Sequence, residues 1–395
     1  MRFRAFAVIT ALLLAVTPSA NSYTALTIDQ IPGAFKELTA NKALANPAVV
    51  LIDIKSGQVI FSRDGNGLRR PASTLKVLSA MSALDYMEPT ATFNTTIYKA
   101  DLKNTFQIIG DFDPSITPDY QLAKSEKFIW SNYLVNKIRA NTKRRNITIK
   151  YYGITSRTQI NMANTFRRYG YRVSWRPINQ ASSTSNLGSE IATATSPELS
   201  AILKHTLLWS ENYYAEYLAR IAAVKAGYTY DGKGINHVFH DVLAKADISS
   251  PEIEVKDGSG LSGQNKLSAL TLAKALVKIY SDPKYQSLIQ GLPIGGVSGT
   301  LKSRFLKTAP QGVGLVRAKT GTLNGVVNLA GYIDSGVHEY AFVVIADRVR
   351  HSHYAESNAR AVMDRILGKI AQPLIIAQSE PAPAETIEPI TSVTG

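Results

Sequence analysis

The chain has 395 residues, of which 45% are hydrophobic, and a formal net charge of +14 from 44 Lys or Arg against 30 Asp or Glu. A polypeptide of this size can bury a large apolar core, and its length predicts about two or three domains. The sequence contains no cysteine, which excludes disulfides, thiol catalysis and a lipoprotein cysteine anchor, so the fold depends on packing alone.

The first segment, residues 1–22, has the pattern of a secretory signal peptide. Two arginines precede an apolar run from Ala5 to Val16, and small residues follow around Ala20 and Ser22. No later run reaches the roughly 20 apolar residues of a membrane span. We therefore expect an exported protein of the periplasm or cell envelope, cleaved after Ala20 or Ser22.

Two short apolar runs, Val49 to Ile54 and Gln58 to Ser62, flank a turn and predict a pair of strands. The next pattern, Ser73 to Met87, has helical spacing without an internal Pro or Gly. Lys76 lies one turn after Ser73 on the same face, so its amine can reach the serine hydroxyl. A lysine can activate a serine nucleophile when burial or a neighbouring cation, for which Lys319 is a candidate, lowers the pKa of its amine.

On its own, a Ser-x-x-Lys string is more often a helix cap followed by a solvated lysine than a catalytic pair. A second such string, Ser281 to Lys284, is interpreted as the cap of a short helix that runs from Lys284 to Ile289. The Ser73 and Lys76 pair differs because two further strings follow it in a fixed order.

Residues 91–180 predict a basic inserted domain, with 15 Lys or Arg against 5 Asp or Glu. The segment also carries Trp130, Trp175 and the run Lys143-Arg144-Arg145. Basic and aromatic residues together are typical of nucleic-acid binding. Because an exported chain meets little nucleic acid, we expect no nucleic-acid partner.

The second string, Ser210-Glu211-Asn212, interrupts a helical pattern and therefore lies at a helix junction, where its hydroxyl and amide can relay a proton or hold a substrate amide. The third, Lys319-Thr320-Gly321-Thr322, lies on the first of three predicted antiparallel strands. There the lysine and threonine can bind a carboxylate, and the glycine lets a substrate backbone approach. Taken alone, the second string is equally an ordinary capping junction, and the third is more often a polar strand end before a turn.

In this order, the three strings resemble the motif set of penicillin-binding proteins and class A β-lactamases. Residues 257–262, Asp-Gly-Ser-Gly-Leu-Ser, are similar to a D-G-S-G-L-S signature, and residues 110–114, Gly-Asp-Phe-Asp-Pro, resemble a G-G-G-D-P segment with two positions changed. Residues 299–305 also resemble a family segment. The chain thus resembles the class C low-molecular-mass penicillin-binding proteins, the D-alanyl-D-alanine carboxypeptidase and endopeptidase family.

The resemblance implies that Ser73 is acylated by the penultimate D-alanine of a peptidoglycan stem peptide, with Lys76 as its base. It implies an oxyanion hole made by the backbone N–H groups of Ser73 and Thr322. The implied catalytic residues are Ser73, Lys76, Ser210 and Asn212. The implied substrate-binding residues are Lys319, Thr320, Gly321 and Thr322. β-Lactams are the implied covalent inhibitors, and neither a cofactor nor a metal is expected.

The resemblance also implies an α+β fold, in which a five-stranded antiparallel sheet, built from both ends of the chain, is flanked by helices and carries a smaller inserted domain. The expected segments are the signal peptide 1–22, the catalytic domain 23–90 and 181–377, the insertion 91–180 and the tail 378–395. The tail has few large apolar residues and is predicted to be flexible. Since family members usually carry a longer insertion, one accessory domain is expected to be reduced or missing.

Two other functions fit the same strings. One is a β-lactamase, which differs mainly in how fast water attacks the acyl-enzyme. The other is a non-catalytic wall-binding protein that uses the basic insertion. The insertion itself either contacts an anionic wall or membrane surface or simply carries solvated charges over an aromatic core. Carboxypeptidase and endopeptidase activity both remain open, because each breaks a D-alanyl carbonyl bond.

Overall fold

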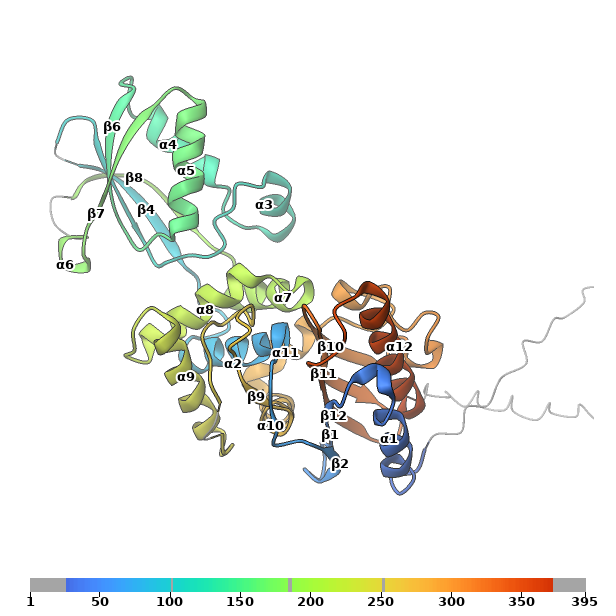
Figure 1. The fold of residues 1–395 in the computed structure, drawn as a ribbon. Helices are drawn as coiled ribbons and strands as arrows, with labels where there is room; N and C mark the ends of the chain where they lie inside the picture. Colours follow the sequence, from blue (N-terminus) through green and yellow to red (C-terminus); the bar gives the residue numbers. More distant parts are fainter. Residues whose placement is uncertain (1–25, 101, 184–186, 251–252, 372–395) are drawn as a thin grey trace, which may run out of the picture.

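The computed structural model describes residues 26–100, 102–183, 187–250 and 253–371 of the chain. The expected signal peptide, 1–22, and the expected tail, 378–395, lie outside these residues. Figure 1 shows two lobes, a larger one that contains both ends of the described chain and a smaller one formed by its middle.

The larger lobe is organised by a five-stranded antiparallel sheet with the order β10-β11-β12-β1-β2. Its strands are β1 (Ala48–Asp53), β2 (Val59–Arg63), β10 (Val316–Leu323), β11 (Val326–Asp334) and β12 (Glu339–Ala346). Strand β1 pairs with β12, so the N-terminal hairpin and the three C-terminal strands form one sheet. This confirms the predicted fold class.

Both faces of the sheet are covered by helices, which explains the continuous apolar run in β1. Because successive strand residues point to opposite faces, Val50 and Ile52 enter one core while Val49 and Leu51 enter another. Helices α2 (Lys76–Tyr86) and α10 (Ala269–Ser281) contribute to the first core, and α1 (Ile31–Thr39) and α12 (His353–Ile370) to the second.

The remaining elements of the larger lobe surround α2. They are α7 (Leu199–Trp209), α8 (Asn212–Lys225), α9 (Gly232–Lys245), α11 (Gln286–Gly291), the short strands β3 (Leu68–Arg69) and β9 (Leu267–Ser268), and 3-10 turns at Lys42–Leu44, Ala72–Leu75, Pro283–Tyr285, Gly299–Leu301 and Pro310–Gly312. Helix α2 packs against α8 and α9, and every residue from position 76 to position 84 is buried. A helix buried on all sides is typical of the centre of a large domain.

The structure refines two helix boundaries that the sequence predicts. The helix predicted from Ser73 opens with the 3-10 turn Ala72–Leu75 before α2 begins, as is frequent at helix N-termini. The predicted cap Ser281 is the last residue of α10, and Asp282 caps the next turn instead, accepting a hydrogen bond from the Lys284 backbone N–H at 3.1 Å.

The smaller lobe contains a mixed five-stranded sheet of its own, with the order β7-β6-β5-β4-β8. Its strands are β4 (Asn94–Ala100), β5 (Thr105–Gly110), β6 (Asn146–Tyr152), β7 (Arg172–Pro177) and β8 (Leu187–Thr195), and its helices are α3 (Tyr120–Glu126), α4 (Ser131–Ala140), α5 (Ser156–Arg168) and α6 (Gln180–Ser183). The parallel pairs β5–β6 and β6–β7 are joined by helical crossovers, as parallel strands require. Strand β8 lies beyond the 91–180 range expected for the insertion.

No described helix combines the length and the hydropathy needed to cross a membrane.

Candidate active site

Ser73 lies in the 3-10 turn between β3 and α2, and the sheet holds this turn in place. The preceding residue, Ala72, has φ 47°, a left-handed conformation that is uncommon for a residue with a side chain. The Asn328 side chain on β11 donates hydrogen bonds to the carbonyls of Pro71 and Arg70, at 2.8 and 2.9 Å. Strained turns persist where surrounding contacts fix them, and here Asn328 supplies such contacts.

The Lys76 ammonium is buried beneath Ser73. Its Nζ atom lies 2.8 Å from Ser73 Oγ, 2.7 Å from Asn212 Oδ1 and 2.5 Å from the Ser259 carbonyl oxygen. The three contacts come from the 3-10 turn Ala72–Leu75, the first residue of α8 and the loop after position 256. Lys76 is therefore the point at which three distant parts of the chain meet.

Burial lowers the pKa of Lys76 to about 7, and the nearby carboxylates of Asp257 and Glu211 oppose this change. A buried amine loses the hydration that stabilises its charged form, which favours the neutral form. Near neutral pH, a large fraction of Lys76 is thus a free amine that can accept a proton from Ser73 Oγ. Burial, rather than the cation Lys319 considered from the sequence, is the main cause.

Lys319 lies on β10 and is fully buried. Its Nζ atom donates hydrogen bonds to Ser210 Oγ at 2.8 Å and to the Thr320 carbonyl at 2.9 Å. Burial lowers the pKa of Lys319 well below its usual value, and the charge of Lys76 lowers it further. Ser210, which ends α7 with φ 62°, is thereby held between the second lysine and the cleft.

A cleft of about 370 Å³ opens above these groups. Five of the residues predicted from the sequence line it, namely Ser73, Ser210, Asn212, Thr320 and Thr322. Lys76, Lys319 and Gly321 are buried beneath its floor. A Cβ atom on Gly321 would lie only 2.9 Å from the Pro71 carbonyl oxygen, so the glycine lets β10 pack closely against the start of the turn that carries Ser73.

Sequence reasoning did not assign several residues at the far side of this cleft. Thr300 Oγ lies 2.9 Å from Thr320 Oγ, and Arg304 and Arg360 add guanidinium groups there. Arg304 is fixed by the Asp364 carboxylate, which accepts from its Nε at 2.9 Å. Residues 299–305 resemble a family segment, but nothing in their spacing indicates chemistry, because the β10 contact that gives them their place is not local.

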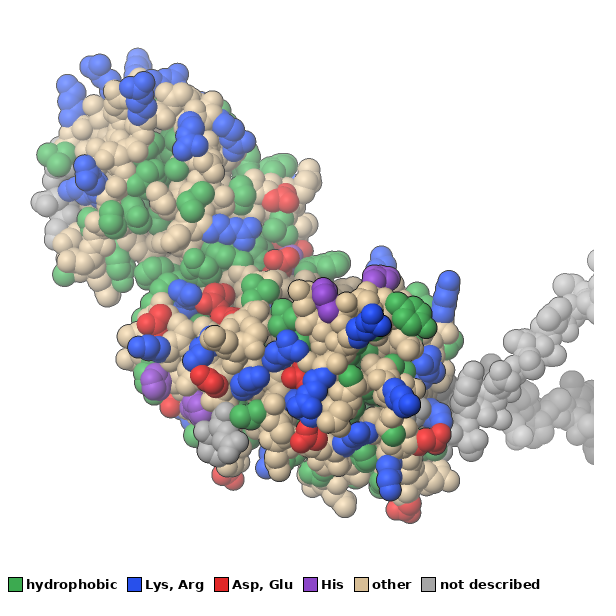
Figure 2. Space-filling model, viewed as in Figure 1, with side chains coloured by type: hydrophobic (Ala, Val, Ile, Leu, Met, Phe, Trp, Pro, Cys, Tyr) green, Lys and Arg blue, Asp and Glu red, His purple; other side chains and the backbone are tan. Residues whose placement is uncertain are grey.

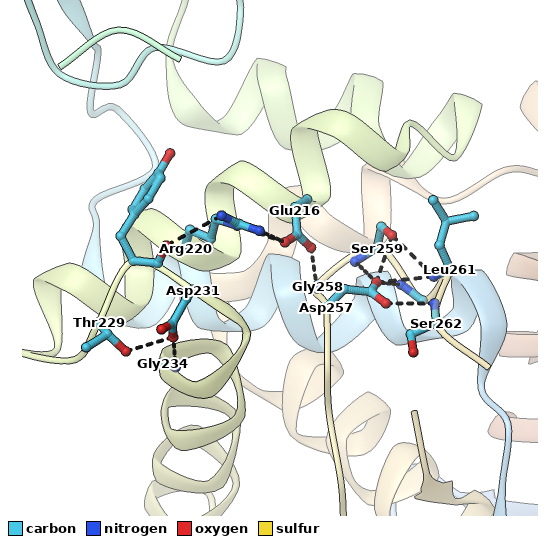
Figure 3. Close-up of polar contacts among 12 residues, drawn as sticks. Glu216, Arg220, Thr229, Asp231, Gly234, Asp257, Gly258, Ser259, Leu261 and Ser262 are labelled. Carbon is cyan, nitrogen blue, oxygen red and sulfur yellow. Dashed lines mark hydrogen bonds and ion pairs between the residues drawn. The ribbon is translucent and has the colours of Figure 1, made fainter. Parts of the chain in front are cut away.

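The loop of residues 257–262 places the Ser259 carbonyl against Lys76, and Figure 3 shows the hydrogen bonds of the Asp257 carboxylate within this loop. The Asp257 carboxylate accepts hydrogen bonds from the backbone N–H groups of Ser259, Gly260 and Ser262 at 2.8, 2.6 and 2.7 Å. Burial alone would raise the pKa of Asp257, but hydrogen bonds outweigh it and lower the pKa, above all the one from the Ser259 hydroxyl and then the one from the Ser262 backbone N–H. Hydrogen bonds to the ionised form stabilise it.

The same loop is also tied to α8. Glu216, one turn after Asn212, accepts a hydrogen bond from the Gly258 backbone N–H at 2.6 Å and pairs with Arg220 at 2.8 Å (Figure 3). Asn212 and the Ser259 carbonyl, the two fixed partners of Lys76, therefore belong to elements that are directly bonded to each other.

A family model describing the D-Ala-D-Ala carboxypeptidase 3 (S13) family matches residues 33–148 and 158–370. The chain belongs to this family. The family assignment agrees with the resemblance seen in the sequence, and both lobes contribute to the match.

Individual relatives match a shorter stretch. The D-alanyl-D-alanine carboxypeptidase of Actinomadura sp. (strain R39) is 34% identical over 188 residues, which are 46% of this chain and 34% of that protein. The D-alanyl-D-alanine carboxypeptidase DacB of Haemophilus influenzae is 32% identical over 162 residues, which are 40% of this chain and 33% of that protein. These matches thus span about a third of each relative's length.

Solved structures share the fold over a longer range. Penicillin binding protein 4 (dacB) of Haemophilus influenzae superposes with a TM-score of 0.68 at 18% identity, covering 84% of this chain and 97% of that one. A structure of the Bd3459 predatory endopeptidase of Bdellovibrio bacteriovorus gives a TM-score of 0.59 at 15% identity, covering 82% and 92%. The chain therefore has the penicillin-binding fold.

Proposed function

We propose that the protein is a serine-type D-alanyl-D-alanine carboxypeptidase or endopeptidase that acts on peptidoglycan stem peptides through an acyl-enzyme on Ser73. The observation that carries this proposal is the buried Lys76 amine, whose pKa is lowered to about 7, at 2.8 Å from Ser73 Oγ. A hydroxyl with such a base beside it is an activated nucleophile. Family membership supports the choice of reaction.

In the proposed acylation step, neutral Lys76 takes the proton of Ser73, and Oγ attacks the carbonyl carbon of the penultimate D-alanine. The backbone N–H groups of Ser73 and Thr322 would hold the oxyanion of the tetrahedral intermediate. The C–N bond then breaks, and Ser210 relays to the leaving amine the proton that Lys76 took from Ser73, which returns Lys76 to its neutral form, with Asn212 holding the substrate amide. Water attacks the ester in the second step, which frees Ser73 and releases the shortened peptide.

The substrate's terminal carboxylate would lie on the β10 side of the cleft. Thr320 and Thr322 present hydroxyl groups there, and Lys319 lies buried beneath the floor. Arg304 and Arg360 add guanidinium groups to the lining of the same cleft. This arrangement supports recognition of a free carboxylate, such as that of a terminal D-alanine or of a penicillin.

Covalent capture by a β-lactam tests this proposal. Intact-mass measurement after incubation with benzylpenicillin is expected to show one adduct per chain, absent in Ser73→Ala. An adduct that persists in Ser73→Ala would contradict the assignment. Rapid turnover of a chromogenic cephalosporin, in place of a stable adduct, would favour the β-lactamase alternative. Release of D-alanine from a pentapeptide, compared with cleavage of cross-linked muropeptides, separates the two peptidase activities.

We further propose that the protein is exported and acts in the periplasm or cell envelope, where its substrate lies. The pattern of residues 1–22 supports export. We also propose that the basic insertion contacts an anionic wall or membrane surface. Figure 2 shows Lys and Arg side chains gathered on the part of the smaller lobe farthest from the larger lobe.

A further inference from the structure

One stripe of helix α8 leads away from the active site along the junction of the two lobes. Tyr213, Tyr217, Ile221 and Val224 follow one another at spacings of four, four and three residues, so they share a face. The Tyr213 hydroxyl lies 2.6 Å from Thr155 Oγ of the smaller lobe. The stripe therefore begins beside Asn212 and faces the inserted domain.

A series of neighbouring aromatic rings begins on this stripe and continues into the smaller lobe. Ring centroids are 4.5 Å apart for Tyr213 and Tyr217, and 6.3 Å apart for Tyr217 and Tyr230. Tyr230 lies 4.9 Å from Phe112, which lies 5.7 Å from Tyr152. The first three rings belong to the larger lobe and the last two to the smaller one, so the series bridges the junction.

The series ends in a cavity of about 560 Å³ between the lobes, larger than the cleft above Ser73. Phe112, Tyr152 and Tyr230 supply aromatic walls, and Glu88, Asp111 and Lys225 supply charged groups. Apolar and aromatic walls with a few polar groups are the usual composition of a small-molecule site. A sugar ring fits this chemistry, because its apolar faces stack on aromatic rings while its hydroxyl and acetamido groups need hydrogen-bond partners.

The distance from the active site to the cavity is similar to the length of a stem peptide. Ile221 and Lys225 lie nine and thirteen residues after Asn212 on α8, which corresponds to about 13 to 20 Å at 1.5 Å per residue. About four stem residues separate the scissile bond from the sugar, and an extended chain of that length spans about 13 to 14 Å. A stem peptide bound at Ser73 would thus bring its sugar to the cavity.

We propose that this cavity binds the N-acetylated amino sugar that carries the stem peptide, so that the protein recognises the glycan as well as the peptide. The inference rests on the proposed peptidase function. Phe112 gives it independent support. This residue has φ 61°, in the left-handed region. A left-handed conformation is costly for a residue with a large side chain, and such costs cluster at functional sites.

The test compares two substrates, a bare pentapeptide and the same pentapeptide attached to its disaccharide. For the wild type, we expect a higher kcat/KM with the disaccharide-bearing substrate, mainly through a lower KM. Phe112→Gly relieves the backbone strain while removing the ring, and Tyr152→Ala removes a second wall. Each is expected to lower the ratio of the two kcat/KM values about tenfold, the equivalent of about 1.4 kcal/mol. Tyr354→Ala, on α12 and 81% exposed, is the matched control and should keep the wild-type ratio.

Direct binding of the free disaccharide, N-acetylglucosaminyl-N-acetylmuramic acid, gives a second measurement. Ligand-observed NMR should detect binding to the wild type and to Tyr354→Ala, and reduced binding to Phe112→Gly. An unchanged substrate ratio in both cavity variants, together with no disaccharide binding by the wild type, would overturn the proposal. If the wild type cleaves neither substrate, the proposed peptidase function fails, and disaccharide binding alone decides whether the cavity recognises sugar.

Discussion

Lys76 connects burial to the proposed chemistry, because the cost of burying its charge supplies the free amine that Ser73 would need as a nucleophile. The pKa is lowered to about 7, so the neutral fraction rises as the pH passes through that value. We therefore expect the second-order rate constant for acylation by benzylpenicillin to increase between about pH 6 and pH 8 and then level off. Stopped-flow measurement of this profile checks the expectation, and a rate that falls over the same range would contradict it.

Glu211 allows a controlled version of the same measurement. Its carboxylate raises the pKa of Lys76, opposing burial, although the two side chains are not hydrogen-bonded to each other. Glu211→Gln removes this charge and keeps the shape of the side chain. The acidic limb of the acylation profile should then move to lower pH. A movement to higher pH would show that another group controls the limb.

The burial of Asp113 leads us to expect a pH effect on stability instead of activity. It is 1% exposed, its Oδ1 accepts from the Ser115 backbone N–H at 2.7 Å, and its Oδ2 has no hydrogen-bond partner among the described residues. Burial raises its pKa from 3.8 to about 7. Between these values, the unfolded chain releases the proton while the folded chain keeps it. The stability that Asp113 contributes below about pH 4 is therefore lost as the pH rises towards 7.

Asp113→Asn removes this titration. At pH 8 the free energy of unfolding of the variant should exceed that of the wild type by about 2 kcal/mol, so the variant should unfold at a higher temperature. The difference should shrink or reverse near pH 4. Differential scanning calorimetry at both pH values measures it. Asp119→Asn is the control, since Asp119 caps α3, and aspartate and asparagine cap a helix equally well. A destabilised Asp113→Asn protein at pH 8 would contradict the prediction.

Strand β10 and the turn that carries Ser73 depend on each other through close packing. Gly321→Ala would place Cβ 2.9 Å from the Pro71 carbonyl oxygen and 3.2 Å from the Thr74 methyl carbon. The strand and turn would have to separate, which should cost about 1–3 kcal/mol of unfolding free energy and slow acylation. Denaturant unfolding and the acylation rate measure the two effects.

Gly33→Ala is the matched control, because a Cβ on Gly33 of α1 would meet no atom within 4 Å, and alanine favours a helix. That variant should be as stable as the wild type or slightly more stable. If Gly321→Ala slowed acylation without loss of stability, close approach of substrate, as expected from the sequence, would be the better account of this glycine.

Positive charge is distributed unevenly over the two lobes, and this affects which surface can contact an anionic wall or membrane. Lys143 and Arg144 are exposed on the smaller lobe. Arg139 and the also exposed Arg145 lie over the Tyr169 and Tyr171 rings at 3.6 and 4.8 Å, so part of the basic surface covers aromatic side chains. The exposed pair is the better candidate for contact with an anionic surface.

Retention on isolated wall sacculi at low salt tests this contact. Lys143→Gln with Arg144→Gln should reduce the retained fraction several-fold, and salt should reduce it for the wild type, because exposed charges are screened. Lys36→Gln with Lys42→Gln makes the same change in net charge on the larger lobe and should retain the wild-type behaviour. Equal retention of both double variants would leave the basic residues as solvated surface charges.

The sequence predicted the sheet of the larger lobe better than the sheet of the smaller lobe. Apolar runs around positions 49–62 and after Lys319 identified strands, and the family resemblance joined them into one sheet, as β1 and β12 are. The parallel pairing of β5, β6 and β7 did not follow from these runs. Pairing of this kind depends on crossover helices and on contacts between distant segments, which a local pattern does not contain.

By itself, the sequence determined the candidate catalytic side chains, because Ser73 and Lys76 are one helical turn apart and the other two motifs follow in order. Only the tertiary structure decided what surrounds them. The partner of Lys76 in residues 257–262 is a backbone carbonyl, which cannot be predicted from a residue type. The lowered pKa of Lys76 arises from burial by elements far apart in the chain. The cavity between the lobes has the same origin, since its walls come from two domains that meet only after folding.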